Sequence, residues 1–219
     1  MSDSIQTDAS TLSQPLPETW LLSEHNIKSH NLVFGLNFRP TKVPKSGLIN
    51  RIKNKQQSMD IDISCLLFDA NCTLVDQVWF KQLRDQSQAI RHHGDSLNGK
   101  DRGSLAEIDH NVDLEQIELR LSKLPEEVQY LTLIVSSYYG QPLTQLEYGA
   151  VRIEDDEGNI IDLQDLNALP ANCNALWLAC LSRELGEWRV TMHKFPLAHH
   201  DIPHIADDIK KELLRALAL

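Results

Sequence analysis

The stretch MDIDISCLLFD, residues 59–69, decides the fold that the sequence predicts. Apolar and polar residues alternate along it, with Ile61, Ile63, Cys65 and Leu67 in one set and Asp60, Asp62 and Ser64 in the other. A period of two is typical of a β-strand that turns one face toward a core. The stretch therefore predicts a strand with two carboxylates on the face opposite its apolar residues.

These two carboxylates favour a bound cation, because like charges a few ångströms apart repel and raise each other's pKa. The loop HHGDSLNG, residues 92–99, offers matching chemistry. Gly94 permits a tight backbone, Asp95 adds a carboxylate, and Asn98 and backbone carbonyls add neutral oxygens, which together form the ligand set that calcium prefers. A solvated strand face and an ordinary Gly-Asp turn are the alternative interpretations, and the sequence leaves them open.

Outward from this stretch, the chain predicts a mainly β protein. We expect strands at residues 31–38, 60–68, 75–81, 88–92, 117–121, 130–138, 148–154, 159–163, 175–182 and 187–193. Hairpin turns are expected at residues 155–158 and 183–186, and a short helix at residues 105–109. A stripe at intervals of four predicts a C-terminal amphipathic helix, and it consists of Ile205, Ile209, Leu213 and Leu217. The predicted fold is a two-sheet antiparallel β-sandwich with a C-terminal α-helix.

The pattern divides the chain into three parts. Residues 1–28 are rich in Ser, Thr, Gln and Pro and predict a mobile N-terminal tail, of which Trp20 and its neighbours can pack back onto the domain. Residues 29–198 form the predicted sandwich, and residues 199–219 the amphipathic helix.

Composition limits the function. The 219 residues carry a net charge of −10 with a pI near 5.3, which argues against a nucleic-acid-binding role. No apolar run reaches the length of a membrane span and the first residues do not form a signal peptide, so we expect a cytoplasmic protein. The four cysteines lie in or beside apolar runs and predict reduced core thiols.

Two further clusters have a functional and a structural interpretation. The segment 39–55 has six basic and no acidic residues, and predicts either contact with an anionic partner or membrane surface, or a solvated loop. Three histidines, His199, His200 and His204, lie beside Asp201 at spacings compatible with zinc, although a polar approach to the last helix explains them as well. A G-x-S-x-G nucleophile motif does not occur.

The order of the motifs resembles the TerD family of bacterial tellurium-resistance and stress proteins. The matching blocks are VFGLNF, MDIDISCLLFDANCTLVD, HHGDSLNG, SKLPEEVQYLTLIVSSYYG, GAVRIEDDEGN and ELGEWRVTMHKF, and the resemblance covers roughly residues 31–197. The resemblance implies a β-sandwich that binds calcium at an acidic corner and acts in resistance to tellurite and other stresses without catalytic activity. It also implies other tellurium-resistance proteins as partners, some of them in the membrane, and a place in the cytoplasm or at the periphery of the inner membrane.

Carried over residue by residue, the resemblance implies a divergent calcium site. Its expected ligand set is Asp60, Asp62, Gly94, Asp95, Asn98, Asp113 and Glu115. Gly99 also matches the family loop, whereas Ser96 and Asn98 replace its Asn and Thr, and Leu114 stands where a carboxylate is expected. Since calcium affinity follows the charge of the ligands, binding is expected to be weak or lost.

The sequence thus predicts a non-enzymatic, calcium-binding or calcium-derived interaction module of the stress response. Two alternatives remain at this stage. One is a metal-dependent hydrolase at the acidic corner with His92 or His93 as its base. The other is a scaffold without metal that works through the basic segment and the C-terminal helix.

Overall fold

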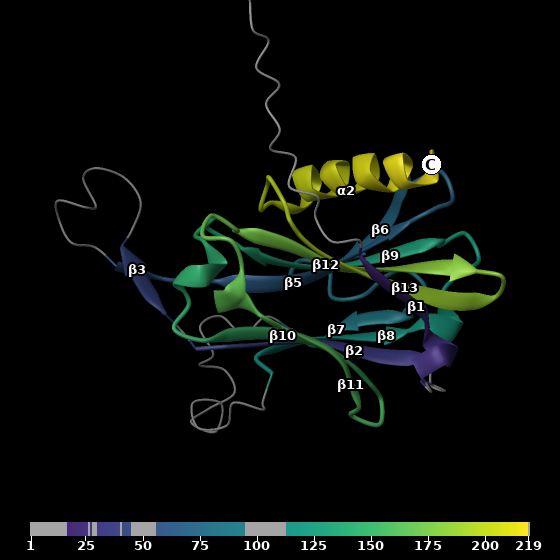
Figure 1. Ribbon diagram of the computed structural model, residues 1–219, viewed down its shortest axis with the longest axis horizontal. Helices are drawn as coiled ribbons and strands as arrows, with labels where there is room; N and C mark the ends of the chain where they lie inside the picture. The colour runs from purple at the N-terminus through teal and green to yellow at the C-terminus, as the bar shows by residue number, and fades with distance from the viewer. Residues whose placement is uncertain are drawn as a thin grey trace, which may run out of the picture.

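The computed structural model describes residues 17–25, 27, 30–39, 41–44, 56–94 and 113–218, and within them it contains two antiparallel sheets packed face to face (Figure 1). Sheet A has the order β1 (Glu18–Leu21), β13 (Glu187–Pro196), β12 (Ala175–Glu184), β9 (Tyr130–Ser137), β5 (Ile61–Phe68) and β6 (Leu74–Val78). Sheet B has the order β11 (Ile160–Asp165), β10 (Gly149–Asp155), β2 (Asn31–Phe38), β8 (Glu115–Arg120) and β7 (Ile90–His92). The two-sheet sandwich is confirmed.

Shorter elements complete the described chain. The strands β3 (Lys42–Pro44) and β4 (Gln56–Ser58) pair in a separate ribbon. Single 3-10 turns lie at η1 (Leu22–His25), η3 (Leu121–Lys123), η4 (Leu143–Gln145) and η5 (Leu166–Ala168). The helix α2 (Ile202–Leu217) lies over the outer face of sheet A in Figure 1. No helix among the described residues is long and apolar enough to cross a membrane.

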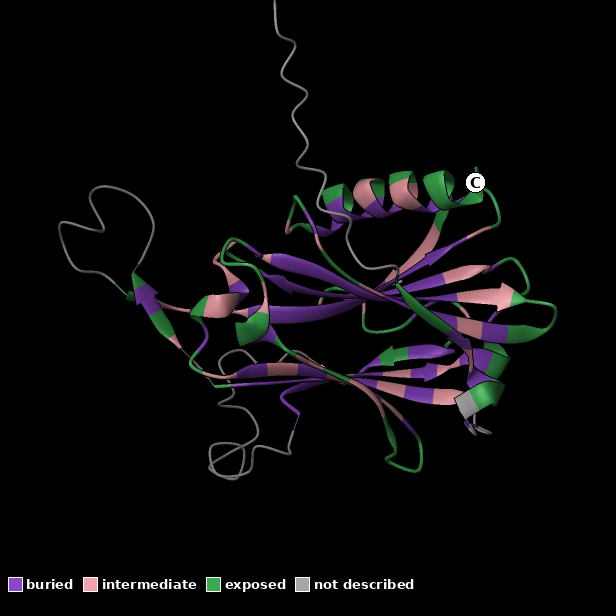
Figure 2. Ribbon diagram, viewed as in Figure 1, coloured by how far each residue is buried: buried purple, intermediate pink, exposed green. Residues whose placement is uncertain are grey.

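Strand β5 is buried on both faces, which its alternating sequence did not predict. Ile61 and Ile63 belong to the core between the sheets, as expected. On the opposite face Leu66 and Phe68 pack into a second cluster beneath α2, and Asp62 on that face is only 5% exposed. Figure 2 shows β5 as an almost continuous buried strand between sheet B and the helix. The face that carries Asp62, for which a solvated surface was one of the open interpretations, is therefore covered.

Helix α2 forms where the apolar stripe predicts it. The Asp201 carboxylate caps its first turn by accepting the His204 N–H, and Pro203 stands in that turn, where a missing N–H costs nothing. Ile205 and Ile209 are fully buried against sheet A, whereas Leu217, the last residue of the predicted stripe, is 56% exposed. The helix is thus part of the folded domain, because its apolar face covers Leu66 and Phe68.

The predicted mobile tail, residues 1–28, is wrong for the strand that begins at Glu18, whereas the packing of Trp20 back onto the domain agrees with the prediction. Residues 18–21 form β1, which pairs with β13 from Glu18 opposite Met192 to Leu21 opposite Arg189. Trp20 and Leu22 are buried in the main core, and the burial of two such side chains offsets the entropy lost on ordering the segment. The domain therefore extends at least to Glu18, and residues 1–16 lie outside the described part.

Local differences from the predicted elements concern turns. The strand expected at residues 75–81 ends at Val78, because Trp79 and Gln82 exchange two backbone hydrogen bonds of 3.0 Å and close a tight turn. Gly158 and Gly186 have φ of 84° and 88°, as their predicted hairpin turns require. The short helix expected at residues 105–109 lies outside the described residues.

The four cysteines are buried free thiols. Burial raises the pKa of Cys173 to about 11 and that of Cys180 to about 12. Such thiols are protonated at neutral pH and act as small apolar core residues, in agreement with the sequence.

Candidate functional site

The predicted strand carboxylates lie where β5 enters sheet A. Asp60 directly precedes the strand, and its backbone carbonyl accepts the Tyr138 N–H at 2.9 Å. Asp62 lies opposite Ser136 of β9 in the strand register. Because Ile61 and Ile63 point into the core between the sheets, the Asp62 side chain points to the other face, toward the start of α2. Asp62 is therefore a carboxylate of the outer face of sheet A.

Glu115 lies on the opposite side of β5, in the space between the two sheets. Its Oε2 accepts the backbone N–H of Ile63 at 3.1 Å in a buried hydrogen bond. Strand β6 pairs with β5 only as far as Cys65, so the backbone of β5 before that residue has no partner from β6. The Glu115 carboxylate thus satisfies a buried donor that would otherwise carry a desolvation penalty.

His92 is the second neighbour of Glu115. Its Nε2 lies 3.5 Å from Glu115 Oε2, and the two side chains are 0% and 1% exposed. The Gly94 N–H donates to His92 Nδ1 at 3.1 Å, which leaves the imidazole proton on Nε2, facing the carboxylate. Gly94 has φ of 107°, so the turn that makes this contact favours a residue without a side chain.

Asp113 lies on the outer face of sheet B and is held there by Arg152. Its Oδ1 accepts Arg152 Nη1 at 2.5 Å and its Oδ2 accepts Gln116 Nε2 at 2.9 Å. The pair crosses over β2 at Gly35, where an added Cβ would lie 2.2 Å from Asp113 Oδ2. The absence of a side chain at Gly35 therefore makes room for the ion pair. Arg152 also donates to Glu154 at 2.9 Å.

The structure therefore separates three predicted ligands. Asp62 faces the α2 side of sheet A, Glu115 faces the space between the sheets, and Asp113 faces the outside of sheet B. The reason for the last separation is a bend at Leu114, which breaks the alternation that would otherwise place Asp113 and Glu115 on one face. Within the described ranges, no three His, Cys, Asp or Glu side chains are grouped closely enough to hold a metal ion.

Two of the predicted calcium ligands have protein partners among the described residues, and the calcium site stays a prediction. Asp113 already has a guanidinium partner, and Glu115 already has an amide and an imidazole as partners. Asp95 and Asn98, the loop ligands of the prediction, lie outside the described residues. Among the described residues, the printed contacts of Asp113 and Glu115 are with protein donors.

The histidine cluster before α2 consists of separate pairs. His204 Nδ1 lies 2.6 Å from Asp201 Oδ1, and His199 Nδ1 lies 2.8 Å from Asp208 Oδ2. The His199 and His204 rings stack at 4.9 Å. These pairs cap and brace the helix start, which agrees with the structural interpretation of the cluster.

Little of the basic segment is described. Arg39 Nη1 contacts Glu147 Oε1 at 2.5 Å, so one of its six charges is paired within the protein. Lys42 is exposed at the start of β3. Residues 45–55, which hold the other four basic residues, lie outside the described part, and the anionic partner stays a prediction.

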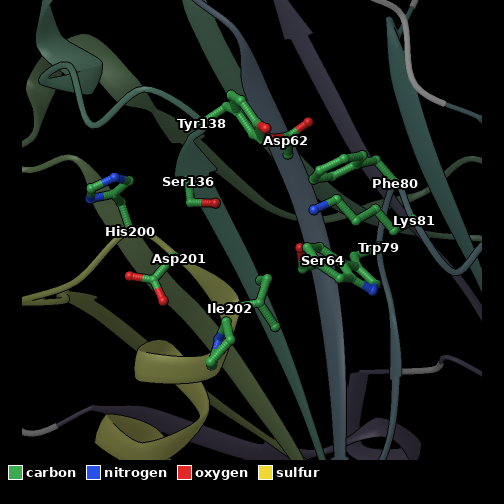
Figure 3. A pocket seen from close by; sticks show the side chains of 11 residues that line it. Asp62, Ser64, Trp79, Phe80, Lys81, Ser136, Tyr138, His200, Asp201 and Ile202 are labelled. Carbon is green, nitrogen blue, oxygen red and sulfur yellow. The ribbon is translucent and has the colours of Figure 1, made fainter.

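Sequence reasoning missed a cavity of about 450 Å³ between the start of α2 and the entrance of β5 (Figure 3). Trp79, Phe80 and Lys81 form one side of it, and Tyr138 adds a third aromatic ring. The sequence signal for the cavity was the pair Trp79-Phe80 followed by Lys81. Without knowledge of the turn at Trp79, these residues look like the end of the preceding strand.

Comparisons with known proteins agree with this architecture. The family model described as TerD domain matches residues 18–194. The tellurium resistance protein TerZ of Serratia marcescens is 29% identical over 200 residues, which are 91% of this chain and 95% of that protein. Two crystal structures share the fold, each covering 80% of this chain and 94% of the other. They are SAV2460, a protein of unknown function, with a TM-score of 0.63 at 16% identity, and SCO6318 of Streptomyces coelicolor A3(2), a homologue of a telluride resistance protein (TerD), with a TM-score of 0.61 at 14% identity.

Proposed function

Because the chain belongs to the TerD family, we propose that it is a non-enzymatic protein of the tellurium-resistance and stress response. Its relative named for tellurium resistance extends over nearly the whole of both chains, which supports a role at the level of the whole protein. We further propose that it is a calcium-derived member, in which protein groups neutralise carboxylates that the family resemblance assigns to a calcium site.

The observation that carries the proposal is the pairing of Asp113 with Arg152. The Asp113 side chain is fully buried and the Arg152 side chain is 18% exposed, so the pair is shielded from water. A calcium ion would supply positive charge between carboxylates at such a corner, and the guanidinium supplies that charge here. A metal and a guanidinium would compete for the same Asp113 oxygens.

Glu115 supports the same interpretation from the other side of sheet B. Its carboxylate accepts the Ile63 N–H and faces the proton-bearing nitrogen of His92. A reduced calcium site with fewer charges stays a prediction. Its ligands would be Asp60 and Asp62, together with Asp95 and Asn98 of the loop whose turn is formed by Gly94.

The hydrolase alternative is disfavoured by the position of its bases. A general base must come within hydrogen-bond reach of a substrate. His92 is 2% exposed and its Nδ1 already accepts the Gly94 N–H. The Nε2 of His93 lies 3.6 Å from the Oε2 of Glu118, a residue of sheet B. Asp62 belongs to the opposite sheet. The arrangement favours a binding protein, which we propose acts in the cytoplasm or at the inner membrane with other tellurium-resistance proteins.

Survival on tellurite tests the cellular role. In a host whose own copy is deleted, expression of this chain is expected to restore growth on tellurite, and an unfolded variant of the same chain is not. Unchanged sensitivity at matched levels of folded protein would reject a role in resistance.

Calcium titration of metal-stripped protein tests whether the site is calcium-derived. Ligand binding stabilises the folded state by RT ln(1 + [L]/Kd), roughly 2.7 kcal/mol at a hundredfold excess over Kd. We expect millimolar calcium to leave the melting temperature nearly unchanged. A rise of several degrees that disappears in Asp113→Asn or Glu115→Gln would overturn the proposal. A rise that disappears only in Asp62→Asn would place calcium at the reduced site.

A further inference from the structure

The cavity at the start of α2 is built from three separate parts of the chain (Figure 3). Its floor is the outer face of β5 and β9, which contributes Asp62, Ser64 and Ser136. These three residues are 5%, 1% and 4% exposed, although they stand on a face that is apolar further along the strands. The polar floor begins where α2 stops covering the sheet, so the helix leaves a recess over buried polar groups.

One wall of the cavity is aromatic. Trp79 and Phe80 meet edge to face at 4.9 Å, and Phe80 meets Tyr138 in the same way at 5.6 Å. The turn after Val78 projects the first two rings, and the end of β9 projects the third. Edge-to-face packing fixes the rings against one another and leaves faces available to a ligand.

The protein places a cation of its own against this wall. Lys81 Nζ lies 5.0 Å from the centre of the Trp79 ring and 5.2 Å from that of Phe80, within the range of a cation–π contact. Figure 3 shows the Lys81 side chain extended between these rings toward the interior of the cavity. An ammonium group is thus already accommodated by the aromatic wall.

The opposite wall adds negative charge. Asp201 lies there and is held by His204, whose Nδ1 is 2.6 Å from Asp201 Oδ1. His200 is fixed against Gly140, where an added Cβ would lie 2.9 Å from its ring. The carboxylates of Asp62 and Asp201 and the ammonium of Lys81 line the cavity, so these three groups together carry net negative charge, which favours cations over anions.

From these features we propose that the cavity binds a small organic cation of the ammonium class. The aromatic rings contact the ammonium group of the ligand through cation–π interactions. The Asp62 carboxylate and the serine hydroxyls of the floor accept hydrogen bonds from N–H groups of the ammonium or from a hydroxyl attached to it. A volume of about 450 Å³ lies within the range of small-molecule sites. Lys81 acts as a tethered competitor that the ligand displaces.

Calorimetric titration with choline and with dimethylbutanol, its uncharged isostere, tests the requirement for charge. The two molecules have nearly the same shape, so they differ in the cation–π and ionic contributions alone. We expect choline to bind saturably and about tenfold more tightly than the isostere at low salt. Equal affinities would overturn the proposal in favour of a merely apolar cavity. Failure of choline to bind at concentrations up to about 50 mM would also overturn it.

Variants of Lys81 test the sign of the ligand's charge. Lys81→Met removes the competing ammonium from an exposed side chain, and we expect choline to bind about tenfold more tightly as a result. The matched control is Lys123→Met, an exposed lysine of η3, which is expected to leave the affinity unchanged. A choline affinity no higher in Lys81→Met than in the control would show that the Lys81 ammonium does not compete with the ligand, and would overturn the proposal.

A second pair of variants tests the floor. Asp62→Asn is expected to weaken choline binding about tenfold or more, whereas Asp207→Asn on the exposed face of α2 is expected to have no effect. Equal affinities of the two variants for choline would show that Asp62 does not contact the ligand, and would overturn the floor of the proposed site. The proposed ammonium site does not depend on calcium binding. Titration with choline, once with a chelator and once with calcium, distinguishes the ammonium site from a calcium site. Choline binding that persists in the chelator supports the cavity whatever the outcome of the calcium titration.

Discussion

Each of the two outer faces of the sandwich carries a buried carboxylate, and the two carboxylates have different surroundings. On sheet B, Asp113 is fixed by the Arg152 guanidinium above Gly35. On sheet A, Asp62 lies on the floor of a cavity beside aromatic rings and the start of a helix. A guanidinium in direct contact makes the sheet B carboxylate structural, whereas the recess on sheet A leaves room for a ligand. Acidic residues of one predicted site can therefore serve stability at one place and binding at another.

Removal of the guanidinium is the change with the largest expected effect. In Arg152→Leu the fully buried Asp113 loses its ionic partner, and loss of one member of a buried pair costs about 3–5 kcal/mol. Urea unfolding measures the loss. Arg120→Leu is the matched control, because its pair with Glu118 is more exposed and contributes less than about 1 kcal/mol. Addition of Asp113→Asn to Arg152→Leu is expected to recover part of the stability, and no recovery would contradict the structural role of the pair.

The helix on sheet A is the next largest expected contribution. Ile205 is 0% exposed beneath α2, and truncation of such a side chain leaves a cavity that costs about 3 kcal/mol. Ile205→Ala is therefore expected to lower the free energy of unfolding by that amount, in a single cooperative transition with the sandwich. Leu217→Ala, at the exposed end of the same helix, is expected to change it little. If the helix melted separately from the sheets in Ile205→Ala, α2 would not belong to the same cooperative unit.

Acidic pH is expected to destabilise sheet A through His193. Burial lowers the pKa of His193 to about 4, and its ring stacks on Trp177 at 3.7 Å. Between pH 6.5 and 4 the unfolded state binds a proton at this residue and the folded state does not, so stability falls as pH falls through this window, by up to about 3 kcal/mol.

His193→Phe isolates this effect, because it keeps a flat ring on Trp177 and cannot titrate. Unfolding measured from pH 7 to pH 5 is expected to slope less in this variant than in the wild type. Hydrogen bonds with Asn159 lower the pKa of Asp155. Its contribution to the stability of the folded state is therefore lost only at lower pH, outside the window from pH 7 to pH 5. Parallel slopes in the two proteins would exclude His193 as the cause.

The smallest expected effect tests the space above β2. In Gly35→Ala the new Cβ would lie 2.2 Å from Asp113 Oδ2, so the carboxylate must move, at a cost of about 2 kcal/mol. Chemical denaturation of Gly35→Ala alone and combined with Asp113→Ala measures the clash. The second substitution removes the side chain that clashes, so Gly35→Ala is expected to cost less in its presence. Additive losses would mean that the glycine serves β2 itself.

Much of the fold was predictable because it depends on local patterns. The alternation of Ile61 and Ile63 with polar residues predicted a strand and its inner face, and Gly158 and Gly186 predicted two hairpin turns. Strand β1 was missed because its four residues follow a polar segment and gain their order from pairing with β13. The turn at Trp79 was missed because no Gly, Asn or Pro marks it.

The candidate site was less predictable, since its chemistry depends on contacts between distant residues. Asp113 meets Arg152 from 39 positions away, and Glu115 meets the Ile63 backbone from 52. Sequence patterns gave the acidic character of these residues and their resemblance to a calcium site. They gave no sign that a bend at Leu114 turns neighbouring carboxylates to opposite faces of sheet B.

By itself the sequence determined the family, most strands of the two sheets, the apolar face of β5 and the terminal helix, because side-chain periodicity and turn residues act within a few positions of the chain. The tertiary structure alone decided which group neutralises each carboxylate and which face of a sheet a helix covers. It thereby made Asp113 a partner of Arg152 and left Asp62 beside a recess. The physical reason is that the energy of a buried charge is set by the groups that the fold brings within hydrogen-bond distance, whatever their separation in sequence.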